Sequence, residues 1–297
     1  MKWRGRKGST NVIDGRRGSG GSRSRIPGGG KSKMGIGVIV VILIISWITG
    51  QNPLNFIDLN DVVGSGDNYA QQSAGNYVGS AEDDELFEFV KVVLQETEDY
   101  WNRAYKNQLG RNYQEPKLYV FDGTVTSRCG RASAASGPFY CPADQTIYLD
   151  LSFFRELRDR FKAPGDFAMA YVIAHEVGHH VQNLLGTIKQ VDSQRGKISQ
   201  AAYNDLSVRL ELQADFLAGV WAHYADRTKD ILDDGDIEEA LNAANAIGDD
   251  RLQKQSQGYV VPESFTHGTS AQRMRWFRKG YETGDLNQGN TFNTNIL

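Results

Sequence analysis

The sequence predicts an α+β fold, with a small β-sheet and a mainly helical half, preceded by a single amino-terminal transmembrane helix. Three observations support this prediction. Residues 117–121 are rich in β-branched and aromatic side chains, which is typical of a strand. Long stretches between residues 81 and 285 repeat apolar side chains every three or four positions, as helices packed on a core do. Residues 34–50 are uncharged and almost entirely apolar, which indicates a membrane span.

The chain begins with a basic segment. Residues 1–33 are rich in glycine, serine, arginine and lysine and cannot build a core, so we expect them to be disordered. Because the basic block lies upstream of residues 34–50, the positive-inside rule places it in the cytoplasm. The rest of the chain would then face the periplasm or the cell exterior. The alternatives to this single-pass anchor are a cleaved signal peptide and a buried core helix.

The remaining boundaries follow from composition. We expect residues 51–80 to form a polar linker, residues 81–285 the folded body, and residues 286–297 a disordered tail rich in asparagine, glutamine and glycine. The net charge of −3 includes the basic start, so the body itself is acidic. An acidic body argues against nucleic acid as a partner.

Apolar periodicity and capping residues define the helices of the body. The expected helices cover residues 81–109, about 166–186, 199–226, 236–257 and 271–280, with residues 187–197 as a loop. Asp166 is the expected cap of the second helix, and Ser270 is that of the last.

Two strands are expected just before the second helix. Residues 138–141 and 146–151 flank a tight turn over residues 142–145. An edge strand at this place is suited to hold an extended peptide by β-augmentation.

Cys129 and Cys141 are the only cysteines. In an exported domain, two thiols at this spacing favour a disulfide. A metal-binding pair is the alternative, but the spacing, with no histidine nearby, does not resemble a zinc clip.

The chemistry concentrates in residues 171–182, which contain His175, Glu176 and His179 as H-E-x-x-H. Histidines four apart on a helix share one face, so both imidazoles can bind one Zn²⁺. Glu176 can then act as general base toward a metal-bound water. A single histidine on an apolar helix is more often a core residue, but the complete motif inside an apolar helix favours a metal site.

The third ligand must come from elsewhere. The extended motif with a third histidine would need glycine and histidine where Gln182 and Leu185 stand. Glu211 lies among apolar residues of the next long helix, where a carboxylate is costly unless it is paired or metal-bound. Asp215, one turn later, is placed to accept the free ring N–H of a ligand histidine. The alternative is that both acids lie on a solvated face. His180 points away from His179 and suits packing or support of the site.

These motifs resemble known peptidases. HEVGH followed by ELQAD resembles the gluzincin metallopeptidases, whose third zinc ligand is a glutamate on a second helix. Longer stretches resemble the putative neutral zinc metallopeptidase family over nearly the whole chain; they are the MKWRGR start and residues 137–154, 174–182, 211–223 and 266–285. The resemblance implies a zincin-like fold, with zinc bound by His175, His179 and Glu211 and with Glu176 as acid and base.

Two further residues are expected near the centre. Gluzincin-like enzymes use a histidine outside the zinc sphere to stabilise the oxyanion, and His267 is the candidate here. A structural hydrogen bond from a loop histidine is the alternative. Arg273 is expected to position that loop or to pair with an acid of the site.

Together these features predict a membrane-anchored zinc endopeptidase that acts on a peptide or protein substrate outside the cytoplasm. The rival hypothesis is a zinc-stabilised, membrane-associated binding or assembly module with little turnover. A non-peptide hydrolase with the same site is a third hypothesis.

Overall fold

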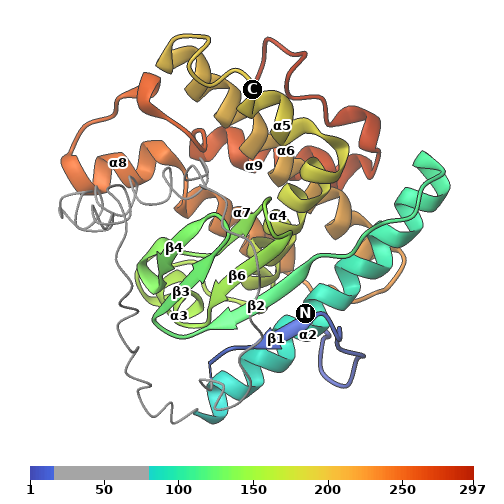
Figure 1. Cartoon of the computed structure of the whole chain (residues 1–297). Helices are drawn as coiled ribbons and strands as arrows, with labels where there is room; N and C mark the ends of the chain where they lie inside the picture. The colour runs from blue at the N-terminus through green and yellow to red at the C-terminus, as the bar shows by residue number, and fades with distance from the viewer. Residues whose placement is uncertain (17–79) are drawn as a thin grey trace, which may run out of the picture.

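The computed structural model describes residues 1–16 and 80–297 (Figure 1). It confirms the α+β class, because a small sheet packs with several helices. The strands are β1 (Val12–Asp14), β2 (Lys117–Phe121), β3 (Thr124–Ser127), β4 (Gly130–Ser133), β5 (Phe139–Cys141) and β6 (Thr146–Asp150). The α-helices are α2 (Ala81–Ala104), α3 (Ser152–Asp159), α4 (Asp166–Leu185), α5 (Thr187–Asp192), α6 (Gln200–Arg227), α7 (Asp236–Ala246), α8 (Asp249–Gln257) and α9 (Ser270–Thr283). Short helical turns are η3 (Tyr105–Leu109), η4 (Ala134–Ser136), η5 (Pro262–Ser264) and η6 (Leu286–Gln288).

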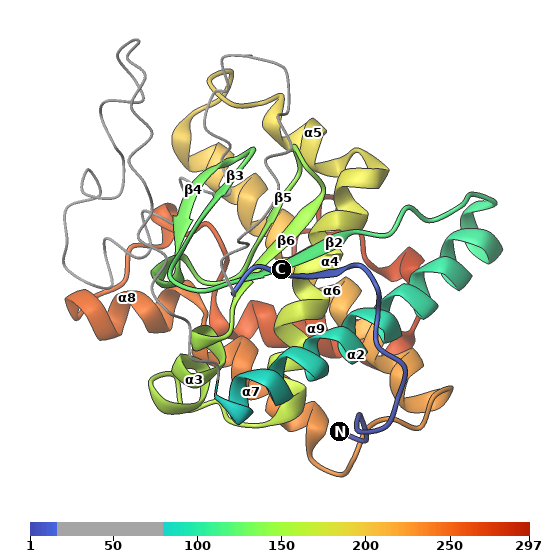
Figure 2. The same cartoon turned by 60° about the horizontal axis from the view of Figure 1, so that its bottom comes forward.

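Helix α4 lies at the centre of the fold. It contacts α2 and strand β5 as well as helices α6 and α7, so it joins the sheet to the helical half (Figure 2). Its apolar residues are accordingly buried around most of its circumference; Phe167, for example, stacks on Trp221 of α6 with ring centroids 5.7 Å apart. A helix buried in this way is held firmly enough to position side chains for chemistry.

The main sheet has the order β1-β2-β6-β5. Strands β1, β2 and β6 are parallel, whereas β5 pairs antiparallel with β6, with Phe139 opposite Tyr148. The expected strands around residues 142–145 are therefore confirmed, and β5 is an edge strand of this sheet. Strands β3 and β4 form a separate hairpin.

The predicted disulfide is confirmed. Cys129 and Cys141 are bonded, with their Cα atoms 5.7 Å apart. Cys129 lies in the turn of the β3–β4 hairpin and Cys141 ends β5. The bond therefore ties the hairpin to the edge strand.

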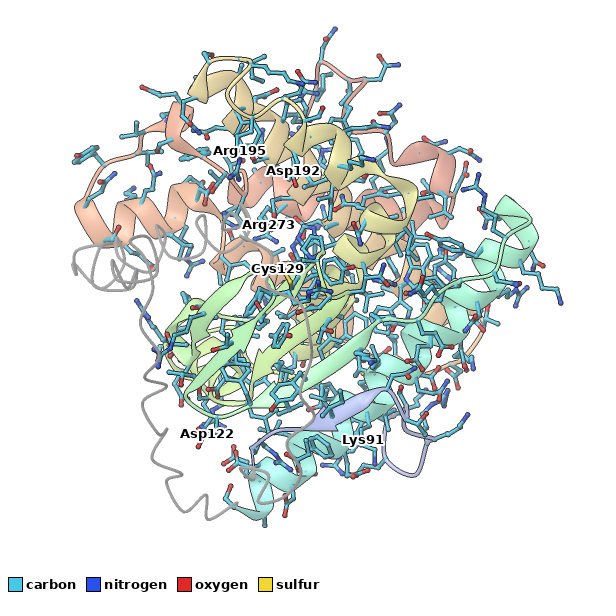
Figure 3. The ribbon with its side chains drawn as sticks, in the orientation of Figure 1. Lys91, Asp122, Cys129, Asp192, Arg195 and Arg273 are labelled. Carbon is cyan, nitrogen blue, oxygen red and sulfur yellow. A yellow bond between two sulfur atoms is a disulfide. The ribbon has the colours of Figure 1, made fainter. Side chains whose placement is uncertain are left out.

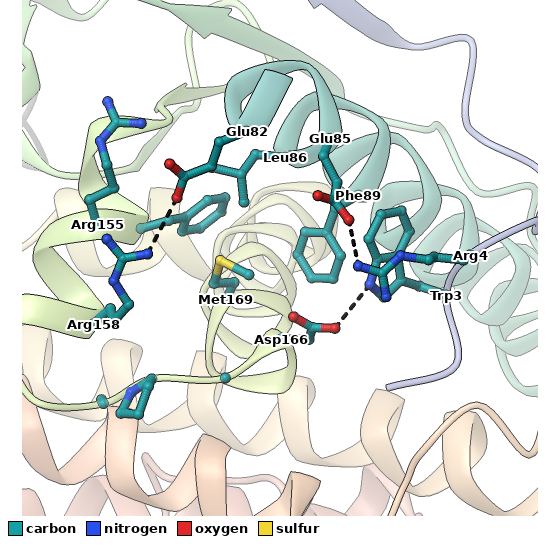
Figure 4. A pocket seen from close by; sticks show the side chains of 14 residues that line it. Trp3, Arg4, Glu82, Glu85, Leu86, Phe89, Arg155, Arg158, Asp166 and Met169 are labelled. Carbon is teal, nitrogen blue, oxygen red and sulfur yellow. Dashed lines mark hydrogen bonds and ion pairs between the residues drawn. The ribbon is translucent and has the colours of Figure 1, made fainter. Parts of the chain in front are cut away.

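The expectation of disorder is wrong for residues 1–16. Strand β1 pairs with β2, and the Trp3 ring packs on Phe89 of α2 with centroids 5.4 Å apart. The Trp3 indole N–H donates to Asp166 at 2.9 Å, and Arg4 pairs with Glu85 (Figure 4). These residues border a cavity of about 250 Å³ between the amino-terminal segment, α2 and the start of α4. Composition alone could not reveal this order, because most of the residues that stabilise the segment lie far away in the sequence.

Several predictions fall on residues 17–79, outside the described part of the chain. These are the anchor at residues 34–50, nearly all of the linker, and the rest of the basic segment. Among residues 1–16 and 80–297, no helix is both long and apolar enough to cross a membrane.

Two helix caps differ from the prediction. Gly165 precedes α4 with φ of 120°, and Asp166 is the first helical residue, where its carboxylate accepts the Trp3 N–H instead of capping the helix. Thr269 caps α9 through a hydrogen bond from the backbone N–H of Gln272, so Ser270 is the first helical residue. In both places the helix begins within one residue of the expected position.

Three further expectations are wrong. Residues 187–192 form helix α5 instead of a loop. The helix expected over residues 236–257 is divided at Gly248, where a Cβ would lie 2.4 Å from the backbone nitrogen of Ser270. The tail is ordered, since Thr291 is fully buried and its hydroxyl donates to the carbonyl of Arg209 at 2.6 Å.

Candidate metal centre

The H-E-x-x-H motif lies in the buried middle of α4. His175 and Glu176 are 7% and 8% exposed. Gly178 lets α6 approach closely, because a Cβ at this position would lie 3.0 Å from the carbonyl oxygen of Ala214. The backbone of α6 is therefore in close contact with α4 at Gly178. This contact brings the Glu211 turn of α6 against the two histidines.

Three candidate ligands converge. The Nε2 atom of His175 lies 3.1 Å from Oε2 of Glu211, and Nε2 of His179 lies 3.4 Å from Oε1 of the same carboxylate. One possible ligand atom from each residue falls within 4.8 Å of the others. Tetrahedral ligands at zinc bond lengths lie about 3.3–3.5 Å apart. The residues present therefore fit a zinc ion, and the structure brings together the three residues that the sequence selected.

The carboxyl groups of Glu211 and Glu176 have pKa values that are shifted in opposite directions. Burial opposes ionisation of Glu211, but the imidazoles of His179, His267 and His175 outweigh it and hold the pKa of its carboxyl well below the ordinary value. Burial raises the pKa of Glu176, although the nearby imidazoles oppose the rise. The carboxylate of Glu211 is thus kept anionic, as a metal ligand must be. The carboxyl of Glu176 is brought closer to the range in which it can both take up and release a proton.

His175 is held from behind by a buried ionic network. Its Nδ1 atom lies 2.8 Å from Oδ1 of Asp215, which is fully buried. Arg273 of α9 donates to both carboxylate oxygens of Asp215, at 2.9 and 3.0 Å, from the interior of the helical half (Figure 3). The Tyr171 hydroxyl also donates to Asp215, at 2.6 Å. Asp215 and Arg273 therefore lie where the sequence placed them, beside the ligands.

Three supporting residues were not predicted from the sequence. Tyr171 lies one turn before His175 on the same face of α4. Gln182 lies one turn after His179, and its Oε1 atom is 2.9 Å from Nδ1 of that histidine. For these two the helical spacing was an available signal. Asp249 had no such signal, because its partners lie in a distant loop.

Asp249 organises the loop that carries His267. Its Oδ2 atom accepts the backbone N–H groups of Thr266, His267 and Gly268 at 2.7, 2.7 and 3.2 Å. Its Oδ1 atom lies 3.3 Å from Nδ1 of His267. The imidazole lies close enough to Glu211 to lower the pKa of that carboxyl. His267 is thus near the centre, and its chemical role stays a prediction.

His180 faces the sheet instead of the ligands. Its Nε2 atom lies 2.6 Å from the carbonyl oxygen of Gln114, and its Nδ1 atom lies 2.9 Å from the hydroxyl of Tyr140 on β5. The carbonyl can only accept, so Nε2 carries the proton and Nδ1 accepts from tyrosine. His180 therefore supports packing between α4 and β5.

Fold and site together define an α+β protein of the H-E-x-x-H class, in which a glutamate from a second helix completes the set of three candidate ligands. The chain belongs to the putative neutral zinc metallopeptidase family, whose sequence model matches residues 1–292.

Similar proteins span the same length or part of it. The uncharacterised protein YpfJ of Escherichia coli K12 is 46% identical over 301 residues, covering 100% of both chains. The uncharacterised protein Rv2575 of Mycobacterium tuberculosis H37Rv is 48% identical over 190 residues, which cover 61% of this chain and 63% of that protein. No solved structure matches the chain.

Proposed function

We propose that this protein is a zinc-dependent endopeptidase. The observation that carries the proposal is the convergence of His175, His179 and Glu211 beside the buried Glu176. Zinc bound by the three ligands would polarise the scissile carbonyl and supply an activated water. Glu176 takes a proton from the attacking water and delivers it to the leaving amine. His267, oriented by Asp249, donates a hydrogen bond to the oxygen on which negative charge develops.

The substrate class in this proposal is an extended peptide. Strand β5 is the edge strand beside α4, and its Tyr140 contacts His180, the residue after ligand His179. Edge strands offer unpaired backbone groups that an extended peptide can satisfy. The disulfide at Cys141 steadies this edge by holding it to the β3–β4 hairpin. These features favour a peptide over a compact small molecule.

The proposed location is outside the cytoplasm, with residues 34–50 as the membrane contact. The disulfide suits an oxidising compartment. The expected arrangement, with residues 1–33 in the cytoplasm and the body outside, stays a prediction, but the pairing of β1 and β2 in one sheet favours a different topology for the amino-terminal segment. Within the proposal, residues 1–16 and the body therefore lie on the same side of the membrane.

The test of the enzymatic proposal uses the purified full-length protein and a diverse peptide library, with and without a chelator. We expect hydrolysis that the chelator abolishes and that zinc restores. The variant Glu176→Gln should keep its zinc and lose hydrolysis, while the exposed control Glu282→Gln should keep both. Uncleaved peptides under all conditions would contradict the proposal and leave the zinc-stabilised binding module as the better explanation.

A further inference from the structure

The two histidines of the centre are supported in different ways. His175 faces the carboxylate of Asp215, which is surrounded by the donors Tyr171 and Arg273. His179 faces the uncharged amide of Gln182. The three candidate ligands alone do not reveal this difference. Its reason lies in the groups that surround Asp215 and Gln182 on the side away from the histidines.

Gln182 is fully buried in the last turns of α4. Its Oε1 atom lies 2.9 Å from Nδ1 of His179. Its Nε2 atom donates to the carbonyl of Leu210 at 2.7 Å and to Oε1 of Gln213 at 3.1 Å, both on α6. The amide thus connects a ligand on α4 to the residue that immediately precedes Glu211.

The surroundings determine which way the amide points. The carbonyl of Leu210 can only accept a hydrogen bond, so the NH₂ group of Gln182 must face α6. The amide oxygen therefore faces His179, whose Nδ1 must carry the proton. The lone pair of His179 then lies on Nε2, the atom beside Glu211, as metal binding requires.

We propose that Gln182 is a positioning residue of the metal centre. It sets the tautomer of His179, and the carbonyl of Leu210 on α6 fixes the orientation of its amide. A carboxylate could not replace it without cost, because its second oxygen would face the acceptors of Leu210 and Gln213 with no donor available. The inference rests on the proposed function only for metal binding, not for hydrolysis.

The test compares Gln182→Met and Gln182→Glu in the full-length protein. Zinc affinity is measured by competition with a chelator, the ligand geometry by the absorption spectrum of the cobalt-substituted protein, and stability by the melting temperature without metal. Gln182→Met removes the acceptor for His179, so we expect zinc affinity to fall about 10–100-fold and the cobalt spectrum to change. Gln182→Glu keeps that acceptor, so its main defect should be a lower melting temperature.

Gln213→Met is the matched control. It removes one contact of Gln182 but leaves the contact with His179, so zinc affinity should stay within about twofold of the wild type, a change of less than 1 kcal/mol. Wild-type affinity and spectrum in Gln182→Met would overturn the proposal. The proposal would also be overturned if, in both Gln182→Met and Gln182→Glu, zinc affinity fell only in proportion to the melting temperature. Because hydrolysis is not measured, failure of the peptidase proposal would leave this result interpretable.

Discussion

Gly219 of α6 and Gly280 of α9 lie against each other's helix backbone. A Cβ at Gly219 would lie 2.1 Å from the carbonyl oxygen of Phe277, and a Cβ at Gly280 would lie 2.1 Å from that of Phe216. This reciprocal contact brings the two helix axes unusually close. Because Arg273 lies two turns before Gly280 on α9, the crossing also determines how far its guanidinium reaches toward the metal-binding face of α6.

We predict that Gly280→Ala destabilises the protein. Alanine favours a helix by about 1 kcal/mol over glycine, but the collision is with backbone and cannot be relieved by a side-chain rotation. The net loss in the free energy of unfolding should be about 1–3 kcal/mol, measured by urea denaturation. The exposed variant Glu282→Ala on the same helix should change stability by less than about 0.5 kcal/mol. Wild-type stability in Gly280→Ala would show that the crossing adjusts freely.

His267 should affect turnover but not metal binding. We expect His267→Ala to lower kcat about 10²–10³-fold, because a donor to the developing oxyanion is lost, with KM and zinc content nearly unchanged. Asp249→Asn should cause a smaller loss in kcat. Its NH₂ group would replace one carboxylate oxygen and would therefore face either Nδ1 of His267 or the backbone N–H groups of the loop. Steady-state kinetics and metal analysis measure both effects. Loss of zinc from His267→Ala would instead identify His267 as a ligand.

His180 should make stability depend on pH. Burial lowers the pKa of its imidazole to about 4, below the ordinary value of 6.5, although the hydrogen bond to Gln114 opposes this shift. Between these pH values the unfolded chain takes up a proton that the folded protein does not. Stability from this residue is therefore complete above pH 6.5 and falls by about 3 kcal/mol as the pH falls to 4.

The matching variant is His180→Gln, which keeps a donor for Gln114 and an acceptor for Tyr140 but does not ionise. Denaturant unfolding of the metal-free protein from pH 4 to 8 gives the difference between the two proteins at each pH. We expect this difference to change by about 3 kcal/mol in favour of the variant as the pH falls. Parallel stability curves for the two proteins would contradict the assignment of His180 as a buried neutral residue.

The amino-terminal segment should share a compartment with the body. Lys2 and Tyr259 have exposed side chains, 48% and 62% respectively, while both native cysteines are in the disulfide. The single variants Lys2→Cys and Tyr259→Cys should therefore react alike with a membrane-impermeant maleimide in intact cells, with lysed cells as the control for reactivity. Labelling of only one position in intact cells would mean that β1 is not paired with β2 in the cell.

Local pattern was sufficient for much of the site. The spacing of His175 and His179 within an apolar helix, and the position of Glu211 one turn before Asp215, depend only on helical periodicity. The strand at residues 117–121 was predictable from its β-branched and aromatic side chains, and the disulfide from the presence of only two cysteines. The sequence by itself therefore determined which residues are available to bind a metal and on which helices they lie.

Only the tertiary structure decided what supports those residues. The amide of Gln182 has a defined orientation because carbonyl groups of α6 face it, and Asp249 holds the His267 loop through backbone N–H groups far along the chain. The order of residues 1–16 likewise comes from Trp3 meeting Asp166 and from β1 meeting β2. Helical periodicity specifies neighbours within a few residues. The partners that satisfy a buried polar group are set by how distant segments pack, and no local pattern carries that information.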